Sequence, residues 1–140
     1  MDNKDLVRRY ISEVINGKNI AAVDELWQSN LVWHAGASGE IHGADMLKQS
    51  FQFLFGGIPD LHAHEESVFA EGDLIATRWT ITGTHAGTMM GIPATGKKMQ
   101  WMGIDLFRIE NGKIAEEWVG DDMLGLMQQL GAIPTPKGQP

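Results

Sequence analysis

Two adjacent carboxylates, Asp121 and Asp122, end a segment with the sequence IAEEWVGDD, just before an apolar stretch. If this segment is a regular strand, Asp122 shares a face with Trp118 and Asp121 points the other way. A carboxylate on an apolar face can enter a cavity, where its pKa rises and it can carry protons near neutral pH. We expect Asp122 to be the proton-transfer residue and Asp121 to face solvent. The alternative is that one of them caps a helix beginning near Met123.

Two histidines are further candidates for acid–base chemistry. His34 follows Trp33 in a short extended segment, and an imidazole with a pKa near 6.5 is a competent base or hydrogen-bond donor. His85 stands where a strand meets a loop rich in glycine and methionine, so it could orient a substrate carbonyl or pair with Asp122. For both histidines, a purely structural, hydrogen-bonded role is the competing interpretation.

A metal centre is not expected from this sequence. His62 and His64 are spaced to share one strand face, and Glu66 follows them. Zinc sites usually combine three protein ligands with an open position, and this group lies away from the glycine-rich loop. The chain has no cysteine, which excludes disulfides and thiolate ligands. There is also no phosphate-binding loop, dinucleotide fingerprint or nucleophile elbow, so we expect no cofactor.

Composition limits the remaining classes of protein. The chain has 140 residues, 43% of them hydrophobic, which is enough for one domain with a core. A net charge of −7 argues against binding to nucleic acid or to an anionic membrane. The N-terminus lacks an apolar signal segment, so we expect a cytoplasmic protein. We expect a single domain over residues 1–133 and a mobile, proline-containing tail over 134–140.

Hydrophobic periodicity divides the chain into helices followed by strands. Helical spacing predicts helices over residues 6–15, 20–27, 46–55 and 123–130, and alternation predicts strands over 31–34, 61–70, 74–85, 98–109 and 113–121. Asn111-Gly112 is a strong signal for a two-residue hairpin turn, because both positions tolerate positive φ. Helices first and antiparallel strands afterwards indicate an α+β domain.

Several sequence blocks resemble one known family. The last strand and helix contain the pattern Ile114, Glu116, Trp118, Asp122, Gly125, Leu126, Gln129, Leu130 and Gly131. Earlier blocks are Pro59-Asp60, Glu71-Gly72-Asp73, Gly83-Thr84-His85-x-Gly87 and Gly91-Ile92-Pro93-x-Thr95-Gly96-Lys97. Together these resemble the SnoaL-like polyketide cyclases of the nuclear transport factor 2-like superfamily, which also contains ketosteroid isomerase.

The resemblance implies a fold and an assembly. The expected fold is a cone in which three N-terminal helices pack on a curved, mostly antiparallel sheet, followed by a short C-terminal helix. It also implies a homodimer or homotetramer formed through the outer face of the sheet. Asp122 would occupy the family's catalytic aspartate position, and His34 would lie on the segment that carries the base in ketosteroid isomerase-like members.

We expect an apolar pocket lined by aromatic residues and methionines. Asp105 shares strand parity with Trp101 and Phe107, which makes it a candidate for the pocket wall. Tyr10 is either a donor to the substrate, as in ketosteroid isomerase, or ordinary core. The expected substrate-binding residues are Tyr10, Trp33, Phe51, Phe55, Trp79, Met89, Met90, Ile92, Trp101, Asp105 and Trp118.

These expectations favour an enzyme that uses no cofactor and acts on a small hydrophobic or polycyclic carbonyl compound. The reaction implied by the resemblance is an intramolecular aldol cyclisation or a related isomerisation. Three alternatives remain open on the same scaffold. They are a ketosteroid isomerase-like or epoxide-hydrolase-like enzyme, a non-catalytic protein that binds a small hydrophobic ligand, and an interaction module that uses the outer face of the sheet.

Overall fold

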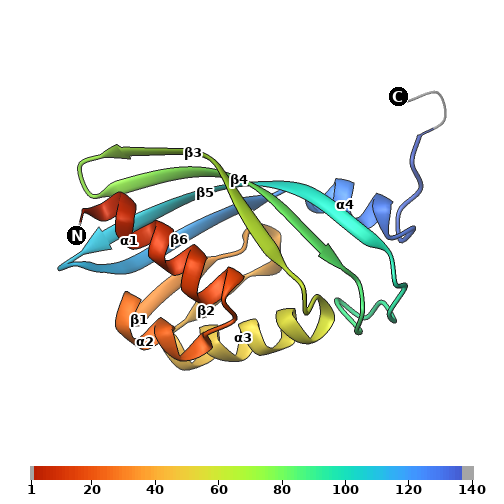
Figure 1. Cartoon of the computed structure of the whole chain (residues 1–140), viewed down its shortest axis with the longest axis horizontal. Coiled ribbons are helices and arrows are strands. Elements are labelled where there is room, and N and C mark those ends of the chain that lie inside the picture. Colours follow the sequence, from red (N-terminus) through yellow and green to blue (C-terminus); the bar gives the residue numbers. More distant parts are fainter. Residues whose placement is uncertain (1, 137–140) are drawn as a thin grey trace.

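A curved six-stranded sheet is the scaffold of the molecule (Figure 1). In the computed structural model, which describes residues 2–136, its strand order is β2-β1-β6-β5-β4-β3. Neighbouring strands are antiparallel except β1 and β6, which are parallel. The strands are β1 (Trp27–His34), β2 (Glu40–His42), β3 (His62–Glu71), β4 (Leu74–Thr84), β5 (Lys98–Glu110) and β6 (Lys113–Asp121).

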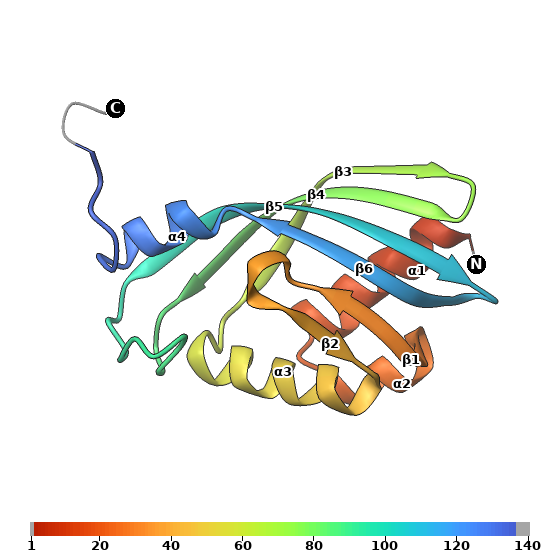
Figure 2. The same ribbon diagram turned by 180° about the vertical axis from the view of Figure 1, so that it is seen from behind.

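The N-terminal helices cover the concave face of this sheet, whereas α4 packs against the beginning of β5 at one end of the sheet (Figures 1 and 2). The first helix changes from α-helical to π-helical after Tyr10 without a break in the chain. The helical segments are α1 (Asn3–Tyr10), a π-helical segment (Ile11–Asn16), α2 (Val23–Leu26), α3 (Ala44–Gly57) and α4 (Met123–Gln129). The predicted α+β cone, with three N-terminal helices and a short C-terminal one, is confirmed.

The boundaries differ from the prediction mainly around Trp27. Hydrophobic spacing placed this residue in the second helix, but its backbone is extended and begins β1. Its fully buried ring packs edge-on against Tyr10, with ring centroids 5.3 Å apart. Tertiary packing therefore overrides the local helical pattern at this point. The predicted tail lies partly outside the described residues, because the structure covers only 134–136 of it.

The predicted hairpin between β5 and β6 forms as expected. Asn111 and Gly112 have φ values of 52° and 75°, as the turn requires, and Glu110 pairs with Lys113. This tight turn fixes the register in which β6 begins its pairing with β5.

A β-bulge then changes the facing of β6. Ile114 pairs with Ile109, but the next pair along joins Glu116 to Arg108, so Ala115 is an extra residue on β6. Two adjacent residues, Ile114 and Ala115, are consequently both buried. From there on the odd-numbered residues of β6 face the helices, because the inserted residue reverses the alternation.

The helix layer is joined to the sheet by packing and by a side chain that acts as a strand partner. The Asn16 side-chain amide donates to the carbonyl of Ala63 (3.0 Å) and accepts from its N–H (2.8 Å), at the edge strand β3. This arrangement satisfies an otherwise unpaired part of the sheet edge. Among residues 2–136, no helix is both long enough and apolar enough to cross a membrane.

Candidate active site

Three carboxyl groups meet in a cavity between the helix layer and the sheet. Asp105 of β5 and Glu117 and Asp121 of β6 line this inner cavity, which has a volume of about 110 Å³. Asp105 is 8% exposed and Glu117 3% exposed. Buried carboxyl groups are unusual unless they are neutral or well bonded.

Backbone and indole N–H groups hold two of these carboxyls in place. The Gly120 N–H donates to Oδ1 of Asp105 over 3.2 Å, and the Trp33 indole N–H donates to Oε1 of Glu117 over 2.8 Å. Asp105 and Glu117 are also coupled electrostatically, because the charge of Asp105 raises the pKa of Glu117. Repulsion between two buried negative charges favours a state in which one of the pair holds a proton.

Asp121 is the least enclosed member of the group. Its Oδ2 lies 3.4 Å from the Trp101 indole N–H, a long hydrogen bond. Gly103 pairs with Asp121 across the sheet, and a Cβ at position 103 would lie 2.6 Å from its Oδ1. The missing side chain at Gly103 therefore provides the space that the Asp121 carboxyl occupies.

Burial shifts the titration of all three groups in the same direction. Burial, reinforced by the charge of Asp121, raises the pKa of Asp105 to about 7. Burial and then the charge of Asp105 raise the pKa of Glu117 well above its ordinary value. Burial also raises the pKa of Asp121, although the Trp101 N–H opposes the shift. Proton binding near neutral pH is typical of carboxyls that act as acids or bases.

Aromatic rings form most of the remaining wall. Of the predicted pocket residues, Tyr10, Trp33, Phe51, Trp79, Trp101 and Asp105 line the inner cavity. Burial, followed by the charges of the nearby carboxyls, raises the pKa of Tyr10, so its hydroxyl is a neutral potential donor. The π-helical segment places Ile11 and Ile15 against the same cavity. No lysine or arginine is among the lining residues, so the charged groups of this cavity are all acidic.

Five other predicted pocket residues do not line this cavity: Phe55, Met89, Met90, Ile92 and Trp118, the last of which is described below. Phe55 stacks on Phe51, with ring centroids 5.7 Å apart. The Lys18 ammonium lies over the Phe55 ring, 5.1 Å from its centroid. Met89 and Ile92 are half-buried and pair with each other within their loop, where Met89 packs near Gly57 at the end of α3. Met90 is 54% exposed. The loop closes against the helix end rather than against the carboxyls.

The expectation that Asp122 enters the pocket is wrong. Asp122 is exposed and is the N-cap of α4, where its Oδ1 accepts from the Gly125 N–H over 3.0 Å. Asp121, expected in solvent, lies in the cavity instead. The bulge at Ala115 reverses the facing of β6 and is the physical reason for both errors.

The same reversal carries Trp118 to the outer face of the sheet, where it meets His34. Trp118 is 36% exposed, and its ring stacks on the His34 imidazole with centroids 5.3 Å apart. The predicted roles of Trp118 as a pocket residue and of His34 as a pocket base are therefore not supported by their positions. Trp33, the neighbour of His34 in β1, is the residue that faces inward.

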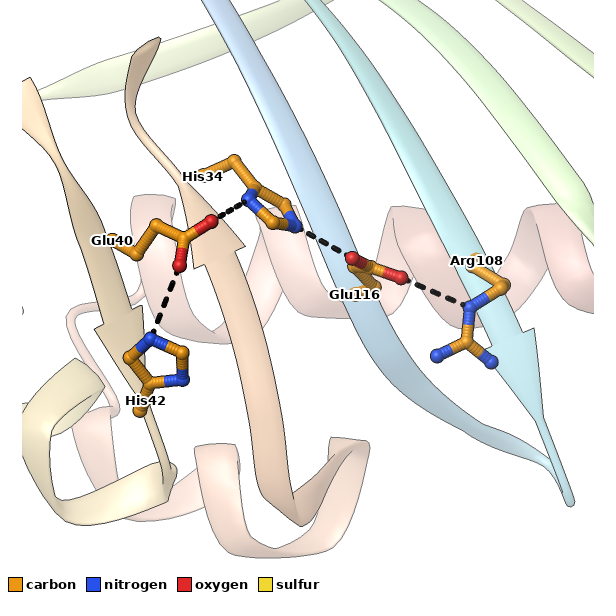
Figure 3. A network of polar contacts seen from close by, with 5 residues as sticks. All are labelled: His34, Glu40, His42, Arg108 and Glu116. Carbon is orange, nitrogen blue, oxygen red and sulfur yellow. Dashed lines mark hydrogen bonds and ion pairs between the residues drawn. The ribbon is translucent and has the colours of Figure 1, made fainter. Parts of the chain in front are cut away.

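His34 is instead the centre of a polar network across four strands (Figure 3). Its Nδ1 lies 2.6 Å from Glu40 of β2, and its Nε2 lies 2.5 Å from Glu116 of β6. Glu116 continues the network to Arg108 of β5 (3.2 Å), and Glu40 also contacts His42 (3.2 Å). The hydrogen bond to Glu116, followed by that to Glu40, raises the pKa of His34. His34 and Glu116 thus hold the short hairpin of β1 and β2 to the rest of the sheet.

His85 has the structural role that was its competing interpretation. It is fully buried, and its Nδ1 lies 2.9 Å from the Thr95 hydroxyl across the loop that precedes β5. Its backbone N–H and carbonyl also bond to Lys97 and Gly96 (2.9 and 2.8 Å). His85 is not among the residues that line the inner cavity. Among the described residues, no hydrogen bond joins His85 to Asp122, whose side chain accepts from the Gly125 N–H.

The histidine pair on β3 is exposed to solvent. His62 and His64 share the outward face, and Glu66 accepts from the Thr80 hydroxyl over 2.9 Å. Within residues 2–136, no three histidine, aspartate or glutamate side chains are grouped as metal ligands.

One signal in the sequence points to Glu117 and Asp121, the two cavity residues that the prediction missed. The apolar pair Ile114-Ala115 interrupts strict alternation directly after the hairpin turn, which is where a bulge changes facing. If the alternation is restarted at Ala115, Glu117 and Asp121 fall on the inner face with Val119.

The comparisons with known proteins place this geometry in a family. A family model described as SnoaL-like polyketide cyclase matches residues 5–130. The chain belongs to the SnoaL-like polyketide cyclase family. It is 30% identical over 139 residues to the aklanonic acid methyl ester cyclase DnrD of Streptomyces peucetius, covering 96% of this chain and 94% of that one.

Two further relatives agree with this assignment. The aklanonic acid methyl ester cyclase DauD of Streptomyces sp. (strain C5) is 30% identical, with 96% of this chain and 85% of that one covered. The crystal structure of AclR from Streptomyces galilaeus, a candidate hydroxylase, superposes with a TM-score of 0.83 at 30% identity, covering 96% of this chain and 84% of that one. The SnoaL-like fold thus accompanies more than one described activity.

The network around His34 predicts a pH-dependent contribution to the stability of this SnoaL-like protein. Because the pKa of His34 is raised, its contribution is complete below its ordinary value of 6.5 and is lost as pH rises through the raised value. Because the pKa of Glu116 is lowered, its contribution is present above 4.5 and is lost as pH falls through the lowered value. In urea unfolding, His34→Gln should therefore be less stable than the wild type mainly at pH values between the lowered pKa of Glu116 and the raised pKa of His34. Above and below this window the difference in stability should be smaller.

The control for this experiment is His62→Gln, which removes an exposed histidine from β3. It should follow the wild-type pH profile. A His34→Gln deficit that stays constant from pH 4 to pH 9 would contradict the ionic role of the network.

The buried carboxyls predict the opposite dependence on pH. As pH rises from about 4 to about 7, the unfolded chain releases the Asp105 proton before the folded protein does, so Asp105 lowers stability progressively. Asp105→Asn should therefore raise the free energy of unfolding at pH 8 by roughly 1 to 4 kcal/mol, with little gain at pH 4. Asp73→Asn, in the exposed turn between β3 and β4, is the matched control. Equal stability of Asp105→Asn and wild type at pH 8 would argue against a buried, proton-binding carboxyl.

Proposed function

We propose that this protein catalyses an intramolecular aldol cyclisation of a carbonyl compound by cofactor-independent acid–base chemistry, with Asp121 as the proton carrier. The observation that carries the proposal is the position of Asp121 in the wall of an aromatic cavity, together with its raised pKa. The names of the relatives DnrD and DauD support a cyclisation as the reaction type.

The first step is removal of a proton from carbon. A carbon between two carbonyl groups is already acidic, so a carboxylate with a raised pKa is a sufficient base. The Asp121 carboxylate takes this proton, and the electrons of the broken C–H bond form an enolate. The long contact with Trp101 (3.4 Å) leaves Asp121 with lone pairs that can face the substrate.

The second step forms the ring. The enolate carbon attacks a second carbonyl carbon of the same molecule, a C–C bond forms, and the carbonyl oxygen becomes an alkoxide. Asp121, now protonated, returns its proton to this alkoxide, so the reaction needs no external acid, oxidant or reductant. Holding the two reacting carbons together in a fixed geometry supplies much of the rate enhancement.

The Asp105–Glu117 pair supplies a donor next to the base. Its shared proton and the neutral Tyr10 hydroxyl can hydrogen-bond to the enolate oxygen as negative charge develops. A protonated carboxyl kept neutral by burial is an effective donor of this kind. Burial of Asp121 itself raises its pKa, which keeps its proton available nearer to neutral pH.

The two adjacent aspartates provide a matched test. With aklanonic acid methyl ester as substrate, Asp121→Asn should lower kcat/KM by about 10² to 10⁴, because the proton carrier is lost. Asp122→Asn should stay within about three-fold of wild type, because asparagine is also a good N-cap for α4. Ring closure is followed by chromatography and mass spectrometry of the product, with circular dichroism to confirm folding. Similar losses in both variants, or in neither, would contradict the proposed role.

The pH profile gives an independent test. Since Asp121 accepts a proton only when ionised, kcat/KM should rise through an apparent pKa above the usual aspartate range. It should fall again at higher pH as the Asp105–Glu117 pair loses its shared proton. Asp105→Asn should shift or remove the descending limb and leave the ascending limb in place. A profile that is flat from pH 5 to pH 9 would favour a protein that binds its ligand without proton transfer.

A further inference from the structure

The inner cavity is too small for the molecule that such a reaction requires. Its volume of about 110 Å³ corresponds to only a few water molecules at roughly 30 Å³ each. Cavities that enclose whole small-molecule ligands usually measure about 300 to 1,000 Å³. The carboxyl cluster can therefore accommodate the reacting end of a substrate, while the rest of the molecule must extend elsewhere.

A larger cavity begins at the wall of the first. This outer cavity has a volume of about 390 Å³ and lies between α3 and the hairpin of β1 and β2. Trp33, Phe51 and Leu54 line both cavities, so the two cavities share part of their wall. Because the Trp33 indole N–H also holds Glu117, a ligand in the outer cavity touches a residue bonded to the carboxyl cluster.

The lining of the outer cavity indicates what it can bind. Ile41 and Leu47 provide apolar walls, Ser38 and Ser50 provide hydroxyl groups, and Met46, at 46% exposed, stands where it can adapt to a ligand. Its charged residue is Glu40, which the His34 network holds at the rim. With acidic groups in both cavities and no lysine or arginine lining either, an anionic ligand is disfavoured.

We propose that the outer cavity is the subsite for the non-reacting body of the substrate, an uncharged, extended ring system bearing hydroxyl or carbonyl groups. The body lies between α3 and the β1–β2 hairpin, and the reacting end passes Trp33 to reach Asp121. The identity of the reacting end rests on the proposed function, whereas occupancy of the outer cavity does not require catalysis. This location differs from the loop that carries Met89, Met90 and Ile92, which the sequence analysis expected to bind the substrate.

The test fills the outer cavity without touching the inner one. Ser50 lines only the outer cavity and Gln49, its neighbour on α3, is exposed, so Ser50→Phe and Gln49→Phe add the same ring at two adjacent positions. The probes are 1,8-dihydroxyanthraquinone, whose three fused rings are too large for the inner cavity, and acetylacetone, which is small enough for it. Binding of the first is measured by equilibrium dialysis and of the second by ligand-observed NMR.

The expected result is selective. Ser50→Phe should weaken binding of the anthraquinone at least ten-fold and leave acetylacetone unchanged, while Gln49→Phe should match the wild type for both. Equal anthraquinone affinity in all three proteins would overturn the proposal, as would a wild type that does not bind the anthraquinone. Asp121→Asn separates the two hypotheses, because its turnover tests the proposed chemistry, whereas the anthraquinone affinity of Ser50→Phe tests the subsite. If Asp121→Asn keeps full turnover while Ser50→Phe loses binding, the proposed chemistry fails and the subsite stands.

Discussion

The inserted residue in β6 is the constraint on which the rest of the site depends. Strands β5 and β6 are joined by a two-residue turn, so their register is fixed from the start, and the bulge at Ala115 is the point at which it changes. Without it, Glu117 and Asp121 would face outward, and Glu116 and Trp118 would take the inner face beside Asp105. With it, three carboxyls enter the cavity, and Glu116 and Trp118 reach the outer face, where they bind His34. One extra residue thus creates both the acidic cluster and the network on the opposite side of the sheet.

The acidic cluster is destabilising for the fold and useful for chemistry for the same reason. Burial raises the pKa of each carboxyl because it disfavours the charged form, and the protein loses stability as pH rises. Indole and backbone N–H groups limit this cost by bonding to the carboxyls. Gly103 contributes in a different way, by leaving room for Asp121. Such strained or costly arrangements are common where function requires an unusual protonation state.

The outer-face network and the cavities are connected through the β1–β2 hairpin. Trp33 and His34 are adjacent in β1 and face opposite sides, so one binds Glu117 inside and the other binds Glu116 outside. The hairpin also walls the outer cavity, and β1 pairs with β6 in parallel through an irregular register. Because the pairing of β1 with β6 is irregular, the side-chain network around His34 adds contacts that hold the hairpin to the sheet. The contact between His34 and Glu40 also fixes Glu40 at the rim of the outer cavity.

The sequence by itself determined the secondary structure in outline, the Asn111-Gly112 turn and the family. It also determined the inward face of β5, because β5 alternates without interruption from Met99 to Ile109. It also determined most of the aromatic wall. It did not determine which aspartate enters the cavity, since periodicity counts residues and cannot show where a pairing partner skips one. Only the pairing of β6 with β5 decided that Asp121 lies inside and Asp122 caps α4. A bulge is a relation between two strands, so its effect on facing becomes visible only when both strands are in place.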